Sequence, residues 1–377
     1  MLHFADRTGL IRPSATLTFN AHVKRLKEHG QDITMFTAGQ PDYEPPRILL
    51  EATKDAIDHR AHVYTPVLGE TKLRELIADY LRKYKLNYTH SEIAVSSGIK
   101  LALANSLLIL AGPGDEVIYP KVCWGTYIDM INLAGARAVS AEVDENFRVT
   151  PETLENVLSP RTKVLILNSP ANPTGTVYSL DDLVKIAEFA VLHNVTVISD
   201  EIYSEIVHEG EHISIAAFEN EVPGIRSLTI TANGISKSMA VPGWRMGYVA
   251  GPSEFIEKFD AMQGTDASNA PSIVQFGLLE TLKDEYKHEL KRYFEEKLAL
   301  LKRRRDVLIE GLKSITLNGK PALCVFAPTG AFYLWVDIRA LKSDVYGKTY
   351  ESIINTLSQP YCLIIMNPGG KLHQTAL

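Results

Sequence analysis

Short apolar runs alternate with helical patterns along the middle of the chain, and this alternation restricts the fold more than any other feature. Residues 93–96, 116–119, 164–167 and 195–199 are strand-like runs, and an apolar helical pattern over residues 101–110 follows the first of them. Strands that alternate with helices build a parallel sheet that helices cover. In such proteins the loops at the carboxyl ends of the strands form the binding crevice. The sequence therefore predicts an α/β fold with its functional site in these loops.

Length, composition and charge narrow the class of protein. The 377 residues exceed the size at which a single core stops growing, which predicts two lobes. Hydrophobic residues make up 45% and charged residues 22%, as in a folded globular chain. The net charge of -6 argues against nucleic-acid binding, and we expect the basic run at residues 302–305 to be a solvent-exposed helix face. The sequence shows neither a membrane-length apolar run nor a signal-peptide pattern, which predicts a cytoplasmic protein.

The cysteines and histidines do not indicate a metal site. Cys123, Cys324 and Cys362 lie far apart, which suits a reducing compartment and predicts neither a disulfide framework nor a zinc site. His59 and His62 are three residues apart, but a third ligand is not near them in the sequence. We therefore expect surface histidines and no metal.

Residues 229–247 carry the most specific chemical signal. Asn233 and Gly234 break a β-branched run, and Lys237 follows among small residues that allow another molecule to approach its amine. A lysine amine forms a Schiff base only when it is partly unprotonated, and a cation such as Arg245 lowers the lysine pKa while also holding an anion. These features predict that Lys237 is a reactive group.

This stretch resembles the lysine motif of class I aminotransferases of fold type I, which depend on pyridoxal 5'-phosphate (PLP). The family pattern is a small, an apolar and a second small residue before the lysine, then a spacer that ends in Gly-x-Arg-apolar-Gly. The chain fills it with Gly234, Ile235, Ser236, Lys237, Gly243, Arg245, Met246 and Gly247. Residues 172–175, Asn-Pro-Thr-Gly, match a second family signature. The resemblance covers roughly residues 10–370 and is greatest to prokaryotic aspartate aminotransferases.

The resemblance implies the fold and its division into domains. It implies the three-layer PLP-dependent transferase fold, with a mostly parallel seven-stranded sheet in a large PLP-binding domain at residues 41–283. Residues 1–40 would form an N-terminal arm and part of a small domain. Residues 284–377 would form a linking helix and a small α+β domain that is apparently truncated.

The resemblance also assigns the residues around the cofactor ring. Lys237 would form the Schiff base and act as general acid and base, and Asp200 would keep the pyridine nitrogen protonated, as a buried carboxylate can. Tyr203 and Asn172 would contact the phenolic oxygen, and Asn172 also the substrate carboxylate. Trp124 would stack on the ring and line the substrate site, although from the residues alone it could be an ordinary core aromatic.

The cofactor phosphate is assigned to the start of a helix. Backbone groups of Ser97, Gly98 and Ile99 would bind it, because the first turn of a helix exposes N–H groups with partial positive charge. Arg245 would bind it as well. The resemblance adds Tyr64 from the partner subunit of a homodimer, whereas the residues alone equally allow a packed loop tyrosine.

Two residues are expected to meet the substrate. Gly39 would lie in the loop over the substrate, although Gly-x-Pro-Asp alone is ordinary turn chemistry. Lys100 opposes the helix macrodipole, so either its stem reaches solvent or, as in one prokaryotic subgroup of aspartate aminotransferases, it binds a distal carboxylate. We predict amino transfer between an L-amino acid, aspartate or glutamate, and a 2-oxo acid. A lyase or racemase of this fold and an impaired PLP-binding regulatory protein are the open alternatives.

The C-terminal residues depart from the family pattern. Family members carry an arginine for the substrate α-carboxylate beyond a Pro-Gly turn, but here Lys371 follows the turn at residues 367–370 and no arginine follows Arg339. A lysine cannot reproduce the bidentate geometry of an arginine. The expectation is a truncated or frame-changed form that binds PLP but transaminates feebly. If it is fully active, Arg12 is the first candidate for the α-carboxylate.

Overall fold

The computed structural model describes residues 2–11, 15–30, 32, 39–59, 62–317, 319–337 and 361–365. Its largest element is a seven-stranded sheet in the order β1-β7-β6-β5-β4-β2-β3. The strands are β1 (Ile93–Ser96), β2 (Glu116–Pro120), β3 (Arg137–Ala141), β4 (Thr162–Asn168), β5 (Thr196–Asp200), β6 (Thr229–Gly234) and β7 (Gly247–Ala250). Neighbours from β3 to β6 pair in parallel, whereas β7 is antiparallel to β6 and β1. This mostly parallel sheet confirms the predicted fold.

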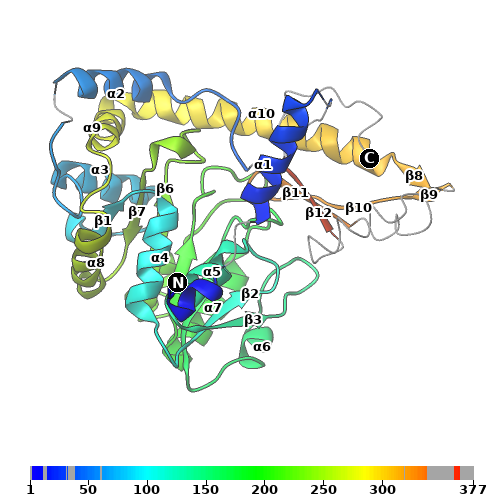
Figure 1. Cartoon of the computed structure of the whole chain (residues 1–377), viewed down its shortest axis with the longest axis horizontal. Helices are drawn as coiled ribbons and strands as arrows, with labels where there is room; N and C mark the ends of the chain where they lie inside the picture. The colour runs from blue at the N-terminus through cyan, green and yellow to red at the C-terminus, as the bar shows by residue number, and fades with distance from the viewer. Residues whose placement is uncertain are drawn as a thin grey trace.

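Helices cover both faces of the sheet (Figure 1). They are α2 (Arg47–His59), α3 (Thr71–Leu81), α4 (Ile99–Leu110), α5 (Thr126–Leu133), α6 (Pro151–Glu155), α7 (Leu180–His193), α8 (Ser253–Asp266) and α9 (Ser272–Thr281). Successive strand residues point to opposite sides, so both sides of a central strand are apolar. In β4, Val164 and Ile166 pack with α4, α5 and α8, whereas Leu165 and Leu167 pack with α7. A third cluster joins α2, α3 and α9 to β1 and β7.

Helix α4 begins earlier than the sequence predicts. It starts at Ile99 rather than at Leu101, because Gly98 takes the N-cap position with a φ of +86°. The first turn of α4 therefore contains Ile99 and Lys100. Short 3-10 helices lie at η1 (Asp6–Gly9), η2 (Arg82–Tyr84), η3 (His90–Glu92), η4 (Ile215–Phe218), η5 (Arg226–Leu228), η6 (Pro242–Trp244) and η7 (Asp284–Tyr286).

A long helix leads from the large sheet to a smaller group of strands (Figure 1). The remaining elements are α1 (Ala15–Glu28), α10 (Lys287–Lys313), β8 (Thr316–Leu317), β9 (Lys320–Pro321), β10 (Cys324–Phe326), β11 (Tyr333–Asp337) and β12 (Tyr361–Ile365). The last three form an antiparallel sheet with β11 in the centre. Among the residues described, no helix is both long and apolar enough to cross a bilayer.

The prediction that residues 302–305 form a solvent-exposed face was wrong for Arg305. This residue is only 5% exposed, and its guanidinium donates to the carboxylate of Glu209 at 2.9 Å and to the carbonyl of Pro328 at 3.1 Å. A basic run in a helix turns through 100° per residue, so its members face different surroundings. Arg305 thus joins α10 to the loop before β11.

Candidate active site

The carboxyl ends of three adjacent strands bring the site together. Asn168 at the end of β4 is the register partner of Asp200 at the end of β5, and Asp200 pairs in turn with Ala232 of β6. The loops that follow these strands carry Asn172, Tyr203 and Lys237. The parallel register therefore places residues that are far apart in sequence at one edge of the sheet.

Lys237 is half-buried directly after β6. Burial and, after it, the charge of Arg245 lower the pKa of its amine to about 8, whereas the carboxylate of Asp200 opposes the shift. The Nζ atom donates to the carbonyl of Gly39 at 2.5 Å, and the Lys237 carbonyl accepts from the hydroxyl of Tyr43 at 3.1 Å. The amine is therefore held within the protein in a form that loses its proton readily.

Asp200 is buried, and two donors hold its carboxylate. The Tyr127 hydroxyl donates to Oδ2 at 2.6 Å, and the Ile202 N–H donates to Oδ1 at 3.2 Å. Burial raises the pKa of the Asp200 carboxyl to about 6, and these two hydrogen bonds limit the rise. A buried carboxylate of this kind favours a cationic partner. Tyr127 was missed in the sequence, because its place in α5 matches an ordinary core position.

Two phenols and an amide meet near Asp200. Asn172 Nδ2 donates to the Tyr333 hydroxyl at 3.2 Å, and the hydroxyls of Tyr203 and Tyr333 are hydrogen-bonded to each other. Burial raises the pKa of both phenols above the usual range, so both stay protonated at neutral pH. The sequence did not identify Tyr333 as a site residue, because it lies in an apolar strand pattern that indicates core packing.

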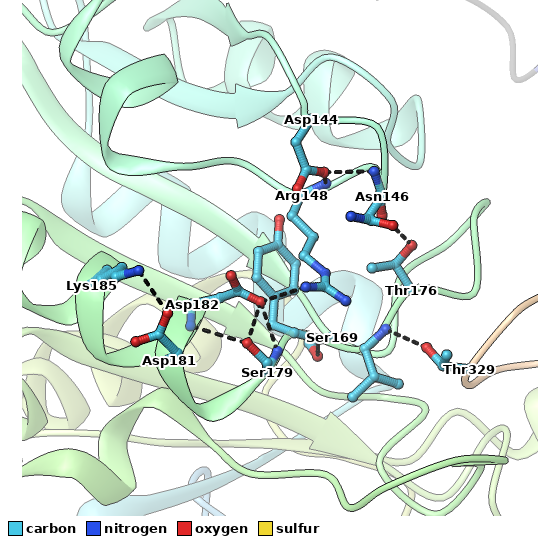
Figure 2. Close-up of polar contacts among 12 residues, drawn as sticks. Asp144, Asn146, Arg148, Ser169, Thr176, Ser179, Asp181, Asp182, Lys185 and Thr329 are labelled. Atoms are coloured by element: carbon cyan, nitrogen blue, oxygen red, sulfur yellow. Dashed lines mark hydrogen bonds and ion pairs between the residues drawn. The ribbon is translucent and has the colours of Figure 1, made fainter.

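The loop that carries Asn172 is bonded to its surroundings at several points, as Figure 2 shows. The Thr176 hydroxyl donates to the Asn146 carbonyl at 2.9 Å. The Val177 N–H donates to the Thr329 hydroxyl at 3.0 Å, which ties the loop to the segment before β11. These bonds hold the loop on the C-terminal side of Asn172.

The same loop is anchored where it enters α7 and where it meets the C-terminal part of the chain. The Asp182 carboxylate accepts from the Ser179 N–H at 3.0 Å and from the Arg148 guanidinium at 2.8 Å (Figure 2). Gly175 has a φ of +71°, and a Cβ there would lie 2.3 Å from Cβ of Pro328. Only glycine combines this backbone conformation with so close a contact.

Backbone atoms converge where β1 runs into α4. Ser97 is half-buried and precedes Gly98, whose left-handed backbone starts the helix. A Cβ at Gly247 would lie 2.4 Å from the backbone nitrogen of Ile99, so β7 packs directly against this turn. The N–H groups of Gly98 and Leu101 donate to the carbonyls of Ser96 and Gly98, whereas those of Ile99 and Lys100 have no acceptor within the helix. These two N–H groups suit an anion.

The Arg245 guanidinium lies at this turn, and a buried hydroxyl without a partner lies next to Lys237. A Cβ at Gly98 would lie 2.4 Å from Nη2 of Arg245, so the guanidinium lies against the turn. Ser236, next to Lys237, is buried, and its hydroxyl has no hydrogen-bond partner among the residues described. A buried hydroxyl without a hydrogen-bond partner lowers the stability of the fold, so this position suits a ligand that accepts a hydrogen bond from it.

Trp124 and Lys100 lie together, whereas Tyr64 lies on the surface. The Trp124 ring packs edge-to-face on Tyr127 with 5.3 Å between centroids, and Lys100 Nζ lies 4.9 Å from the centre of the Trp124 ring. Burial, and then the charge of Arg245, lower the pKa of Lys100. Tyr64 is 87% exposed, so a single copy of the chain does not bring it into the site.

Several predicted residues lie outside the described part of the chain. These are Arg12, Arg339, Lys371 and the turn at residues 367–370. The predictions that concern the α-carboxylate therefore stay predictions.

The fold and the buried lysine define a class of enzyme, and the chain belongs to the family described as aminotransferase class I and II, whose model matches residues 31–367. A probable aspartate/prephenate aminotransferase of Aquifex aeolicus is 36% identical over 351 residues, which are 91% of this chain and 85% of the relative. The aspartate aminotransferase of Geobacillus stearothermophilus is 33% identical over 375 residues, 98% of this chain and 91% of that protein.

Solved structures agree with the sequence relatives. The structure of Thermus thermophilus aspartate aminotransferase with maleate matches with a TM-score of 0.89 and 32% identity, and the match covers 97% of this chain and 95% of that one. These similarities confirm the predicted family, its aminotransferase chemistry and its dependence on PLP.

The residues present fit PLP. Asp200 provides a buried carboxylate for a cationic ring nitrogen. The turn at Gly98 and the guanidinium of Arg245 provide donors for a phosphate. The unpartnered hydroxyl of Ser236 provides a further donor that the described residues leave unused.

Proposed function

We propose that this chain moves an amino group between an L-amino acid, aspartate or glutamate, and a 2-oxo acid such as 2-oxoglutarate, through a Schiff base at Lys237. One observation carries the proposal: the Lys237 amine is held inside the protein with its pKa lowered to about 8, within the electrostatic reach of Asp200 and Arg245. The carboxylate suits a protonated pyridine nitrogen, and the guanidinium suits a phosphate. PLP, when bound, withdraws electrons from the substrate carbon.

Lys237 carries the proton. Its Nζ atom would hold PLP through the cofactor's aldehyde carbon, and the same amine, when free, would act as the general acid and base that carries a proton to and from the substrate. A pKa of about 8 suits a general base near neutral pH, because a sizeable fraction is unprotonated while the group still accepts a proton well.

Three side chains act on the cofactor ring. Asp200 holds the proton on the ring nitrogen, and its own donors, Tyr127 and Ile202, keep the carboxylate in place. Tyr203 and Asn172 donate to the phenolic oxygen, and Asn172 also meets the substrate carboxylate. The bonds of the Asn172 loop to neighbouring segments support this role, because a fixed donor acts without reorganisation.

The phosphate is held by Ser97, Gly98, Ile99 and Arg245. The close approach of the Arg245 guanidinium to Gly98 supports this assignment. Tyr64 adds its hydroxyl from a second copy of the chain in a homodimer. Its 87% exposure supports a role outside its own subunit.

Lys100 selects dicarboxylic substrates. Its amine lies against the ring of Trp124, which we assign to stacking on the cofactor, so its charge faces the site. Lys100 is exposed in a single copy of the chain, and burial is the largest cause of the lowered pKa of its amine. Gly39 covers the substrate. The names of the relatives, which are aspartate or aspartate/prephenate aminotransferases, support this choice.

The domain division that we propose is the predicted one. Residues 41–283 form the large domain, and residues 1–40 and 284–377 supply the arm, the linking helix and the small domain. The seven-stranded sheet and its covering helices lie within the first of these ranges, which supports the boundary.

A half-reaction assay tests the proposed function. Aspartate added to the PLP-loaded protein should convert the bound cofactor to its pyridoxamine form, and 2-oxoglutarate should reverse the change. A lyase would instead release ammonia or pyruvate, and a regulatory PLP-binding protein would leave the cofactor unchanged. Lys237→Ala should abolish the visible absorption of the Schiff base and multiple turnover. Borohydride labelling at another lysine would contradict the assignment.

A further inference from the structure

The hydroxyl of Tyr333 lies among the groups that we assign to the cofactor's phenolic oxygen. Tyr333 is the first residue of β11 and is 3% exposed. Its oxygen accepts from Nδ2 of Asn172 at 3.2 Å and is hydrogen-bonded to the hydroxyl of Tyr203. The ring of Tyr203 packs edge-to-face on that of Tyr333 at 5.5 Å. No role is assigned to Tyr333 by the lysine motif or by the Asn-Pro-Thr-Gly segment.

One arrangement of the hydroxyl protons leaves a donor free for the cofactor. Asn172 Nδ2 is a donor only, so the Tyr333 oxygen accepts from it. Either hydroxyl can donate in the contact between Tyr203 and Tyr333. With Tyr333 as the donor, Tyr203 keeps its own proton for a third partner, the oxygen to which it is assigned.

Backbone bonds hold Tyr333 in this place. The Ala331 N–H donates to the Ile206 carbonyl at 2.8 Å, and the His208 N–H donates to the Thr329 carbonyl at 2.7 Å. The segment before β11 is therefore bonded to the segment that follows Tyr203. This arrangement fixes the distance between the two hydroxyls independently of the hydroxyls themselves.

We propose that Tyr333 is a positioning residue that donates to Tyr203 and so turns the proton of Tyr203 toward the phenolic oxygen of the cofactor. The inference rests on the proposed function. In this arrangement Tyr203 accepts from Tyr333, and a hydroxyl that accepts a hydrogen bond becomes a stronger donor itself. A stronger donor stabilises negative charge on the phenolic oxygen. The proton shared with the neighbouring Schiff-base nitrogen is then released at lower pH.

The test is an equilibrium pH titration of the visible absorption band of PLP bound to the protein. Tyr333→Phe keeps the ring and removes only the hydroxyl. This variant should raise the midpoint of the pH titration of the band by about half a pKa unit, which is a threefold change in the proton equilibrium. Tyr203→Phe should raise it by more. The double variant should match Tyr203→Phe alone, because Tyr333 acts through Tyr203.

Tyr293→Phe is the matched control. Tyr293 lies in α10, and its hydroxyl donates to the Glu44 carbonyl at 2.9 Å. Loss of this hydroxyl should leave the midpoint of the band's pH titration unchanged. An unchanged midpoint in Tyr333→Phe beside a normal wild-type band would overturn the inference and leave the proposed function intact. A full shift from Tyr333→Phe in the Tyr203→Phe background would also overturn it, since Tyr333 would then act on the cofactor directly. A wild-type protein without a band would overturn the proposed function, and this inference with it.

Discussion

The charges around Lys237 should shift its pKa in opposite and predictable directions. Arg245 and Lys100 lower the pKa of Lys237, whereas Asp200 raises it. Removing the charge of Arg245 or Lys100 should therefore raise the midpoint at which the amine loses its proton, and removing that of Asp200 should lower it. The variants Arg245→Gln, Lys100→Met and Asp200→Asn keep approximate size while removing the charge.

The magnitude follows from the pKa of about 8 against the usual 10.5. Lys237 is a base, so its unprotonated fraction grows as the pH rises through its pKa. At pH 7.5 about a quarter of the amine is unprotonated, against about one part in a thousand for an ordinary lysine, a difference of about 200-fold. Each charge removed should move the midpoint by about half a unit, or about threefold in free amine.

Competitive acetylation of the cofactor-free protein measures this midpoint. A trace of anhydride labels every unprotonated amine, and mass spectrometry reads each lysine separately, so the cofactor does not need to bind. Lys185 is an internal control, because its hydrogen bond to Asp181 raises its pKa. A Lys237 midpoint above 9.5 would refute the reasoning. So would Arg245→Gln and Asp200→Asn moving the midpoint in the same direction.

Three further predictions concern substrate choice, the close contact at Gly39 and thermal stability. Lys100→Ala should raise KM for aspartate at least tenfold, because losing one member of a charge pair costs on the order of 2 kcal/mol. KM for an apolar amino acid should change far less, and equal effects on both substrates would show that Lys100 does not bind the substrate. Gly39→Ala should lower kcat/KM because its Cβ would lie 2.6 Å from the Tyr333 hydroxyl, and adding Tyr333→Phe should restore part of the loss, as steady-state kinetics would show. Arg305→Met should lower the thermal midpoint by several degrees, since the Pro328 carbonyl loses a buried donor, whereas the exposed neighbouring Arg303→Met should not.

Local pattern and parallel topology predicted where the candidate residues lie. Asp200 ends a buried strand, Lys237 and Asn172 follow buried strands, and parallel strands bring their carboxyl ends to one edge. Turn-forming residues beside them, such as Gly98 and Gly175, signal close backbone approach in the sequence itself. The roles of these residues toward the cofactor come from the resemblance to class I aminotransferases and stay predictions.

The residues that the sequence missed contribute through contacts between distant segments. Tyr127 lies in a helix and bonds to Asp200, 73 positions away, and Tyr333 lies in a strand and bonds to Tyr203, 130 positions away. Both fit their element as ordinary apolar-face residues, so periodicity predicts packing and gives no sign of the hydroxyl's partner. The prediction for Arg305 was wrong for the same reason. Its run of basic neighbours predicts exposure to solvent, and only the tertiary fold buries the side chain.

The segment that begins at Gly39 connects the linking helix to the reactive lysine. The Gly39 carbonyl accepts from Lys237 Nζ at 2.5 Å, and the Tyr43 hydroxyl donates to the Lys237 carbonyl at 3.1 Å. Between them, Asp42 pairs with Arg304 of α10 at 3.0 Å. A displacement of α10 would therefore pull on both the main chain and the amine of Lys237. If Lys237 binds PLP as we propose, its amine would have to leave the Gly39 carbonyl, and the pair of Asp42 with Arg304 would hold the loop in place.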